Sequence, residues 1–161
     1  TYDMIKVKTV RRGVTFMISS TKRDFLSAPI KQYLISSEKV AHVQIGNYAE
    51  HALLILTKSG YSAIPVLDEQ YRLEGLISLG MIMDRILGLE RIEYDKLANL
   101  KVDDVMHADI PYLTTTDPFQ KGLDLLVDHT FLCVVDENRK FAGILTRRVM
   151  LKKFKKYIYT T

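Results

Sequence analysis

The sequence predicts an α/β (α+β) protein made of two pseudo-symmetric β-α-β-β-α units packed against each other. Three observations support this prediction: an internal repeat, a helix-start pattern that recurs with it, and strand-like apolar runs in each copy. The repeat is the strongest of the three. The stretch "YSAIPVLDEQYRLEGLIS" returns as "FLCVVDENRKFAGILT", so that Asp68 matches Asp136 and Gly75 matches Gly143, each at a spacing of 68 residues.

The elements of the first copy follow in order. Residues 39–45, "KVAHVQI", read as a strand, and a helix should start at Asn47, because Glu50 three residues later completes a capping box. Gly60 fits the end of that helix, since glycine readily adopts the left-handed conformation of a helix stop. Two strands then flank the polar turn "DEQYR", and "GMIMDRILG" closes the copy as an amphipathic helix.

The second copy has the same order. Residues 110–115, "IPYLTT", form its opening strand, and Asp117 with Gln120 repeats the capping box at a spacing of 70 residues. Pro118 suits the first helical position, where its missing N–H is not needed. Strands flank the turn "DENRK", and "RRVMLKKFKKYI" is the closing helix. Because one unit of roughly 60 residues buries only one face of its small sheet, the two copies should pack together to complete a core.

The distribution of charge argues against a nucleic-acid-binding domain. The net charge is +4, with six basic and two acidic side chains in residues 1–24 and six basic and no acidic side chains in residues 146–161. The part between them holds eleven basic and seventeen acidic side chains. An acidic body between basic ends is not the continuous basic stripe that nucleic acid requires, so we expect no nucleic-acid partner.

The apolar pattern argues against a membrane protein. No apolar run reaches the ~20 residues of a membrane span, and the N-terminus shows no secretion signal, so we expect a cytoplasmic protein. The basic C-terminal helix places Met150, Phe154, Tyr157 and Ile158 near one face. Such a helix more often docks on its own domain or on a second copy than on lipid, and no membrane partner is expected.

Nothing in the sequence indicates an enzyme. No two of the histidines, His42, His51, His107 and His129, have metal-ligand spacing, and Cys133 has no CxxC partner. A glycine-rich phosphate loop and a nucleophile elbow are also missing from the sequence. We therefore expect no catalytic residues, no metal and no cofactor.

The repeated pattern resembles the CBS domain. "GYSAIPVLD" followed by "LEGLIS" carries most of the G-x-S-x-x-P-V-x-D…G-x-I-[ST] pattern of that family, and the second copy departs from it at Cys133 and Val134. The resemblance implies tandem CBS repeats, residues 28–98 and 99–157, paired as a Bateman module. Residues 1–16 lie outside it, as an N-terminal extension or as residues added in cloning. Family members typically bind adenine nucleotides between the repeats and relay occupancy to an enzyme, channel or partner.

A narrower resemblance indicates the ligand. "EKVAHVQIGN", "KSGYSAIPVLD" and "TRRVMLK" are similar to the stand-alone cyclic di-AMP-binding CBS proteins of Gram-positive bacteria, the DarB/CbpB group. In adenosine-binding CBS pairs an Asp three residues after the [ST] position holds the ribose diol, but here Met81 and Val149 stand there. Arg147 and Arg148 suit phosphate oxygens through bidentate hydrogen bonds. Together these features favour a nucleotide whose 3′ oxygen is esterified, such as cyclic di-AMP.

The resemblance implies one ligand-binding cleft. It is formed by the opening and central strands of the first copy and the closing turn of the second, with Lys39, Ala41, Tyr61, Ser62, Ala63, Thr146, Arg147 and Arg148. The pseudo-equivalent cleft near Met106, His107 and Pro111 lacks the arginines, and we expect it to be empty.

Each of these residues also has a purely structural interpretation. Tyr61 either stacks on adenine or fills the core beside the helix end, and the small Ser62 and Ala63 either admit a base edge or allow close strand packing. Lys39 alone would be a solvated surface lysine. The two arginines would begin a helix, where cations oppose the helix dipole, so a bound anion explains them better.

Two classes of function follow. The first is a non-catalytic sensor of cyclic di-AMP, a homodimer that by resemblance contacts a (p)ppGpp synthetase/hydrolase and pyruvate carboxylase in its ligand-free state. The alternative is a CBS energy sensor that binds AMP, ADP or ATP, and a more remote one is a basic-tailed adaptor for nucleic acid or membrane. Salt dependence distinguishes the adaptor, because phosphate-backbone binding weakens steeply with ionic strength.

Overall fold

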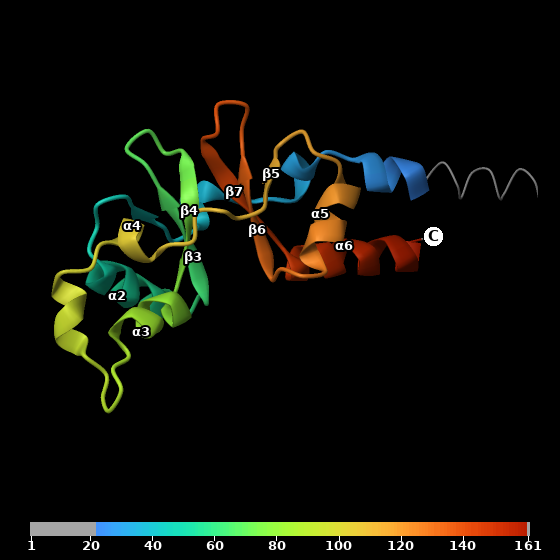
Figure 1. The fold of residues 1–161 in the computed structure, drawn as a ribbon. Helices are drawn as coiled ribbons and strands as arrows, with labels where there is room; N and C mark the ends of the chain where they lie inside the picture. The colour runs from blue at the N-terminus through green and yellow to red at the C-terminus, as the bar shows by residue number, and fades with distance from the viewer. Residues whose placement is uncertain (1–21, 161) are drawn as a thin grey trace, which may run out of the picture.

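The computed structural model describes residues 22–160, so the predicted extension 1–16 lies outside the described residues. Two small sheets lie next to each other, each with its own helices (Figure 1). In the first sheet, β2 (Val43–Gln44) runs parallel to β3 (Ala63–Leu67), which pairs antiparallel with β4 (Leu73–Ser78). Helix α2 (Ala49–Ser59) connects β2 to β3, and α3 (Leu79–Ile86) follows β4.

The second sheet repeats this order. Strand β5 (Tyr112–Thr114) runs parallel to β6 (Phe131–Val135), which pairs antiparallel with β7 (Phe141–Thr146). Helix α5 (Phe119–Leu126) connects β5 to β6, and α6 (Arg147–Thr160) follows β7. The predicted α/β fold of two β-α-β-β-α units is therefore confirmed.

Segments that flank the two units cross to the opposite one. Residues 22–27 are helical, η1 (Ile30–Tyr33) follows, and β1 (Ile35–Ser36) pairs antiparallel with β7 of the second unit. Conversely, η3 (Tyr94–Ala98) and α4 (Val102–Val105) contribute Leu97, Val102 and Val105 to the core of the first unit. The N-terminal segment thus completes the second half, and α4, which follows the repeat boundary, completes the first half together with η3 of the first repeat.

The predicted capping boxes are wrong. Each helix begins two residues after the predicted cap, and neither has a side-chain cap. The side chains of Asn47 and Asp117 instead accept hydrogen bonds from the backbone N–H groups of Gln44 (2.9 Å) and Thr114 (2.8 Å). They close the turn between strand and helix, and Pro118 consequently lies one residue before α5. Gly60 ends α2 at φ 71°, as predicted.

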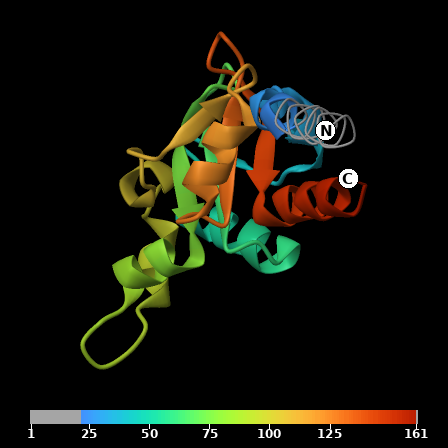
Figure 2. The same cartoon turned by 90° about the vertical axis from the view of Figure 1, so that its right-hand side faces the viewer.

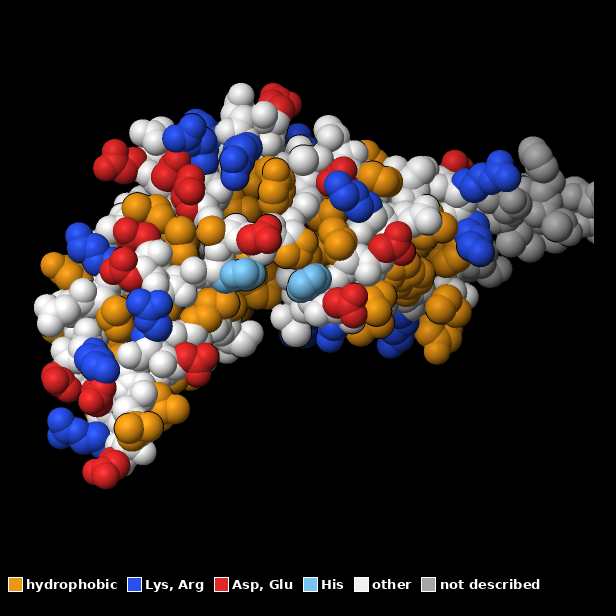
Figure 3. Space-filling view, in the orientation of Figure 1, with side chains coloured by type: hydrophobic (Ala, Val, Ile, Leu, Met, Phe, Trp, Pro, Cys, Tyr) orange, Lys and Arg blue, Asp and Glu red, His pale blue; other side chains and the backbone are white. Residues whose placement is uncertain are grey.

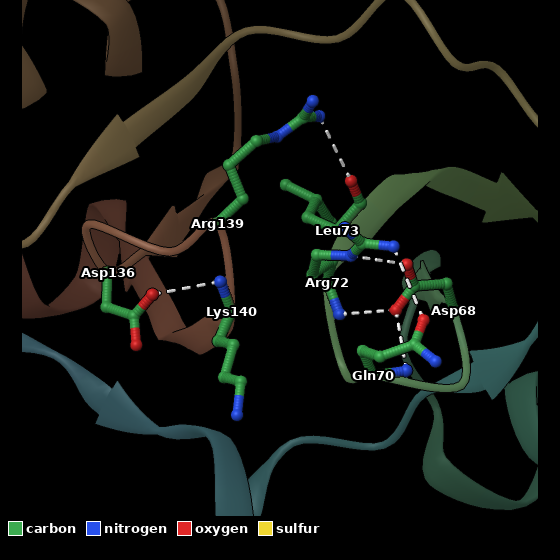
Figure 4. Close-up of polar contacts among 7 residues, drawn as sticks. All are labelled: Asp68, Gln70, Arg72, Leu73, Asp136, Arg139 and Lys140. Atoms are coloured by element: carbon green, nitrogen blue, oxygen red, sulfur yellow. Dashed lines mark hydrogen bonds and ion pairs between the residues drawn. The ribbon is translucent and has the colours of Figure 1, made fainter.

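The polar turns of the two hairpins are built alike. Asp68 Oδ1 accepts from the backbone N–H groups of Gln70 and Arg72, and Asp136 Oδ1 accepts from that of Lys140 (Figure 4). Asp136 Oδ1 also accepts from the backbone N–H of Asn138. These hydrogen bonds hold each turn in one conformation.

The two hairpins meet around a pseudo-two-fold axis. Leu73 N–H donates to the Arg139 carbonyl (3.2 Å), and Phe141 N–H donates to the Tyr71 carbonyl (2.9 Å). The two bonds are equivalent under the 68-residue offset of the repeat. A shared cluster of buried side chains lies beside this junction and draws on both sheets: Val40, Leu67, Leu73, Cys133, Val135, Phe141 and Ile144.

The two ends of the described chain lie side by side. The helical segment 22–27 runs next to α6 in both views of the ribbon (Figures 1 and 2). Phe25 stacks on Tyr157 with a 4.7 Å centroid distance, and it also contacts Phe119 and Phe154. The apolar face of the C-terminal helix therefore packs on its own chain.

Candidate functional site

A cavity of about 300 Å³ opens between the two units. Five of the eight predicted site residues line it: Ala41, Tyr61, Ser62, Ala63 and Thr146. The rest of its wall was not predicted and is mostly apolar: Val40, Gly60, Ile64, Pro65, Thr130, Phe131 and Ile144. No ionised side chain is among these lining residues, so the cavity suits a flat, largely uncharged group such as a nucleobase.

The turn after α2 places Tyr61 and Ser62 at the edge of the cavity. Gly60 adopts the left-handed conformation, and its N–H donates to the Leu56 carbonyl at 3.1 Å, which ends the helix. The chain then reaches β3 within two residues. Tyr61 is 43% exposed, so it does not fill the core, and its ring is available at the cavity wall. The structural interpretation of Tyr61 is therefore disfavoured.

Thr146 joins the cavity to the start of α6. Its Oγ1 accepts a hydrogen bond from Val149 N–H at 3.2 Å. The equivalent bond in the first repeat runs from Met81 N–H to Ser78 Oγ at 3.1 Å. The Thr146 hydroxyl keeps its own proton for another acceptor. The N–H groups of Arg147 and Val149 already donate to the Thr130 carbonyl and to Thr146 Oγ1, so it is the positive end of the helix dipole that favours a phosphate at this end of the cavity.

The structure gives Arg147 a different partner from the expected anion. Its Nε donates to the Leu126 carbonyl at 2.8 Å, and its Nη2 donates to the Val127 carbonyl at 2.9 Å. These carbonyls lie at the C-terminal end of α5, where a cation is favourable. These two carbonyls explain the position of Arg147 without an anion, and its contact with a ligand remains a prediction.

Arg148 and Lys39 remain available for a ligand. Both side chains are exposed, and neither forms a hydrogen bond or an ion pair with any residue between 22 and 160. Arg148 follows the cavity-lining Thr146 by two residues. Lys39 is the last residue of the 3-10 helix η2 (Ser37–Lys39) and directly precedes Val40 and Ala41, which line the cavity. Neither is among the cavity-lining residues, so each adjoins the cavity through its neighbours in sequence.

Part of the missed wall was recoverable from the repeat. Thr130 and Phe131 occupy the positions of Ser62 and Ala63 under the 68-residue offset. Residues near a pseudo-two-fold axis contribute to the same space from both copies, so the two pairs could have been predicted together. Ile144 was recoverable as well, because it lies two residues before Thr146 on β7 and alternate residues of a strand share one face.

The predicted second cleft is crossed by backbone pairing. His107 and Leu76 exchange two backbone hydrogen bonds, at 2.9 and 3.0 Å, and the neighbouring Gly75 lies against the His107 carbonyl. Met106 is half-buried against the first core, and Pro111 is exposed. That this cleft stays empty remains a prediction.

The perturbed ionisable groups lie outside the cavity wall. Burial raises the pKa of Asp68 and of Asp117, but hydrogen bonds from backbone N–H groups and from Arg72 or Lys121 outweigh it and hold both values below the ordinary range. Burial raises the pKa of the Cys133 thiol to about 12. Among the described residues, no cluster of His, Cys, Asp and Glu could hold a metal ion.

Comparison with known proteins supplies the family. The sequence profile of the CBS domain matches residues 30–88 and 102–156. Cyclic di-AMP receptor B of Bacillus subtilis (strain 168) is 52% identical over 142 residues, which are 88% of this chain and 97% of that protein.

Solved structures agree with this match. A CBS domain-containing protein of unknown function from Bacillus anthracis has 58% identity and a TM-score of 0.79, covering 84% of this chain and 98% of that one. CbpB of Listeria monocytogenes in complex with c-di-AMP has 55% identity and a TM-score of 0.76, covering 82% and 98%.

Proposed function

The chain belongs to the CBS domain family, and from this premise we propose that it is a receptor without catalytic activity that binds cyclic di-AMP between its repeats. Its relatives include a protein named as a cyclic di-AMP receptor and a structure with c-di-AMP bound. The division into repeats 28–98 and 99–157 is part of this proposal. A cytoplasmic location is also part of the proposal. No helix among residues 22–160 is long and apolar enough to cross a membrane.

The observation that carries the proposal is the chemistry of the cavity. One adenine would enter the apolar wall, with the exposed Tyr61 ring beside it. A phosphate would lie at Thr146 and the start of α6, where Arg148 supplies a cation with no other partner among the described residues. No carboxylate lines the wall to hold a ribose diol. These residues therefore suit a ribose whose 3′ oxygen is esterified better than a ribose with a free diol.

The size of the cavity refines the binding mode. A volume of about 300 Å³ is at the small end of ligand-binding sites, so it matches one adenosine half of cyclic di-AMP. The second half would lie at the mouth, within reach of Lys39 and Arg148. Arg147 contributes by fixing the end of α5 next to Thr130, whose carbonyl accepts the Arg147 N–H at 3.2 Å.

Calorimetry with a nucleotide panel tests the proposal. Cyclic di-AMP should bind more tightly than AMP or ATP, since neither of these has an esterified 3′ oxygen. A charge-assisted contact is worth about 1.5 to 3 kcal/mol, so Arg148→Ala should weaken cyclic di-AMP binding by roughly ten- to a hundredfold. Lys156→Ala is the matched control, because it removes one positive charge from α6 two turns further on.

The outcomes separate the functions. Equal affinity for AMP and cyclic di-AMP would favour the energy sensor. Equal losses in Arg148→Ala and Lys156→Ala would assign the effect to net charge and not to a contact at Arg148. Binding that collapses with salt in both variants would indicate an adaptor for a polyanion.

We also propose that occupancy controls partner proteins. A ligand changes partner binding only if its own affinity differs between the free receptor and the receptor–partner complex. The ligand-free and ligand-bound receptors must therefore differ in affinity for the partner. By the family resemblance the partners are a (p)ppGpp synthetase/hydrolase and pyruvate carboxylase, contacted in the ligand-free state. Capture of either enzyme by the free protein, released by cyclic di-AMP, would support this; capture unchanged by the ligand would contradict it.

The receptor is proposed to act as a homodimer. Helices of both units leave apolar side chains exposed, among them Leu54 on α2 and Leu151 on α6. Exposed apolar groups on helix faces are suited to a two-fold interface.

A further inference from the structure

The segment between α3 and η3, residues 87–93, forms an arm that projects from the body. It extends past the helices of the first unit in both ribbon views, at the lower left of Figure 1 and of Figure 2. At its tip Leu89 is 106% exposed, and Leu87 at its base is 62% exposed. A single exposed leucine is ordinary, but here two stand on one projection.

The arm is held in shape by its own hydrogen bonds. Gly88 N–H donates to the Arg91 carbonyl at 2.9 Å, and Glu93 N–H donates to the Ile86 carbonyl at 2.7 Å. Leu87 and Ile92 form an antiparallel bridge between these two bonds. The chain therefore presents Leu89 to solvent on a defined turn and not on a slack loop.

A groove of suitable character lies on the same unit. It has a volume of about 610 Å³ and is lined by Tyr48, Glu50, His51, Leu53, Leu54, Thr57 and Leu97. Tyr48 and Leu54 are each 51% exposed, so its apolar wall is open to solvent. We refer to it as the α2 groove.

The arm and the α2 groove both adjoin η3. Lys96 borders the hollow beside the arm, and the next residue, Leu97, lines the groove. The hydrogen bonds at the base of the arm hold Leu89 in solvent, where it is 106% exposed and does not line the groove of its own chain. The arm does not fill the α2 groove of its own chain. In a dimer with a two-fold axis, each arm can fill the groove of the other chain.

We propose that the arm of one chain inserts Leu89 into the α2 groove of a second copy, and that the second copy does the same in return. The inference rests on the proposed homodimer and specifies a contact within it. It is independent of the ligand, because no residue of the arm or the α2 groove lines the cyclic di-AMP cavity.

The charges favour a second copy over an unrelated partner. Beside Leu89 the arm carries Glu90 and Arg91, and the α2 groove carries Glu50 and His51. The arm can therefore pair Arg91 with Glu50 of the second copy. One self-complementary surface thus combines an apolar anchor with opposite charges.

Sedimentation velocity of the full chain over a range of concentrations tests the contact. Leu89→Asp should raise the dimer dissociation constant by at least about tenfold, because it places a carboxylate in an apolar groove. Ile158→Asp is the control, since Ile158 is 66% exposed at the far end of α6. An unchanged dissociation constant in Leu89→Asp would overturn the proposal. A wild-type chain that stays monomeric would overturn it together with the homodimer, and would leave ligand binding to be judged by calorimetry.

Cysteine cross-linking locates the contact. Leu89→Cys and Leu54→Cys chains, mixed and oxidised, should give a dimer band on a non-reducing gel, whereas either variant alone should give less. The native Cys133 should stay silent, because it is buried and its pKa is raised to about 12. No excess cross-link in the mixture, together with an intact dimer, would show that another surface holds the two copies.

Discussion

Two adjacent arginines have different environments in this protein. Arg147 donates to two carbonyls at the end of α5, while Arg148 has no partner among the described residues. The difference follows from the repeat: the first copy ends its helix with Gly60, but α5 ends at Val127 without a left-handed residue. Arg147 supplies the donors that this helix end lacks. The sequence could not predict this, because the partner carbonyls lie about twenty residues earlier in the chain.

Replacing each arginine by alanine should therefore change the free energy of unfolding by different amounts. Arg147→Ala removes two charge-assisted hydrogen bonds to helix-end carbonyls and should lower the free energy of unfolding by about 1 to 2 kcal/mol. Arg148→Ala removes an exposed side chain without partners and should change it by less than about 0.5 kcal/mol. Urea unfolding of both variants measures the difference. Equal losses would mean that the contact of Arg147 with α5 has no energetic weight.

At the scale of elements, the repeat predicted most of the architecture. The sequence pattern correctly predicted the positions of β4, β7, α3 and α6, because their apolar periodicity is long enough to be specific. The opening strands are shorter than predicted, and β1 was missed, because a strand of two residues carries no periodicity. The crossing of the flanking segments depends on long-range pairing that no local pattern records. The helix starts were wrong because Asn and Asp serve turns as well as caps.

The turn at Asp117 gives a prediction for pH. The folded state lowers the pKa of this carboxyl through the Thr114 N–H and Lys121, which outweigh its burial. A depressed folded pKa contributes stability above the unfolded pKa of about 4, and that contribution is lost as pH falls through the folded value. Asp117→Asn, which installs the residue that the first repeat has at Asn47, should keep the turn bond but lose this acid sensitivity.

Urea unfolding near pH 7 and near pH 3 measures the effect. At pH 7 Asp117→Asn should lie within about 1 kcal/mol of the wild type, because the exposed pair with Lys121 contributes little. At pH 3 the wild type should have lost more stability than Asp117→Asn. Asp117→Ala is the control that removes the turn bond and should lose about 1 kcal/mol or more even at pH 7. The same acid sensitivity in the wild type and in Asp117→Asn would refute the assignment.

At the scale of the whole molecule, duplication has produced two halves that differ where ligand chemistry matters. Both have a hydroxyl cap at the end of the closing strand, Ser78 or Thr146, but only the second follows it with arginines. Acidic and basic side chains are interspersed on the face shown in Figure 3, as expected for a surface without a nucleic-acid stripe. From this asymmetry of the closing turns we predict that the ligand binds in one cleft and not in the other.

The cavity between the repeats is the expected binding site of cyclic di-AMP. The most direct test of this expectation is calorimetric titration of cyclic di-AMP into the wild type and into Ser62→Leu, in which a larger side chain stands at the cavity wall. Ser62 is exposed, so the variant should keep the unfolding midpoint of the wild type. We expect saturable binding to the wild type and at least about a tenfold loss of affinity in Ser62→Leu, equivalent to about 1.4 kcal/mol. Equal affinity in the two proteins, with both folded, would contradict this expectation.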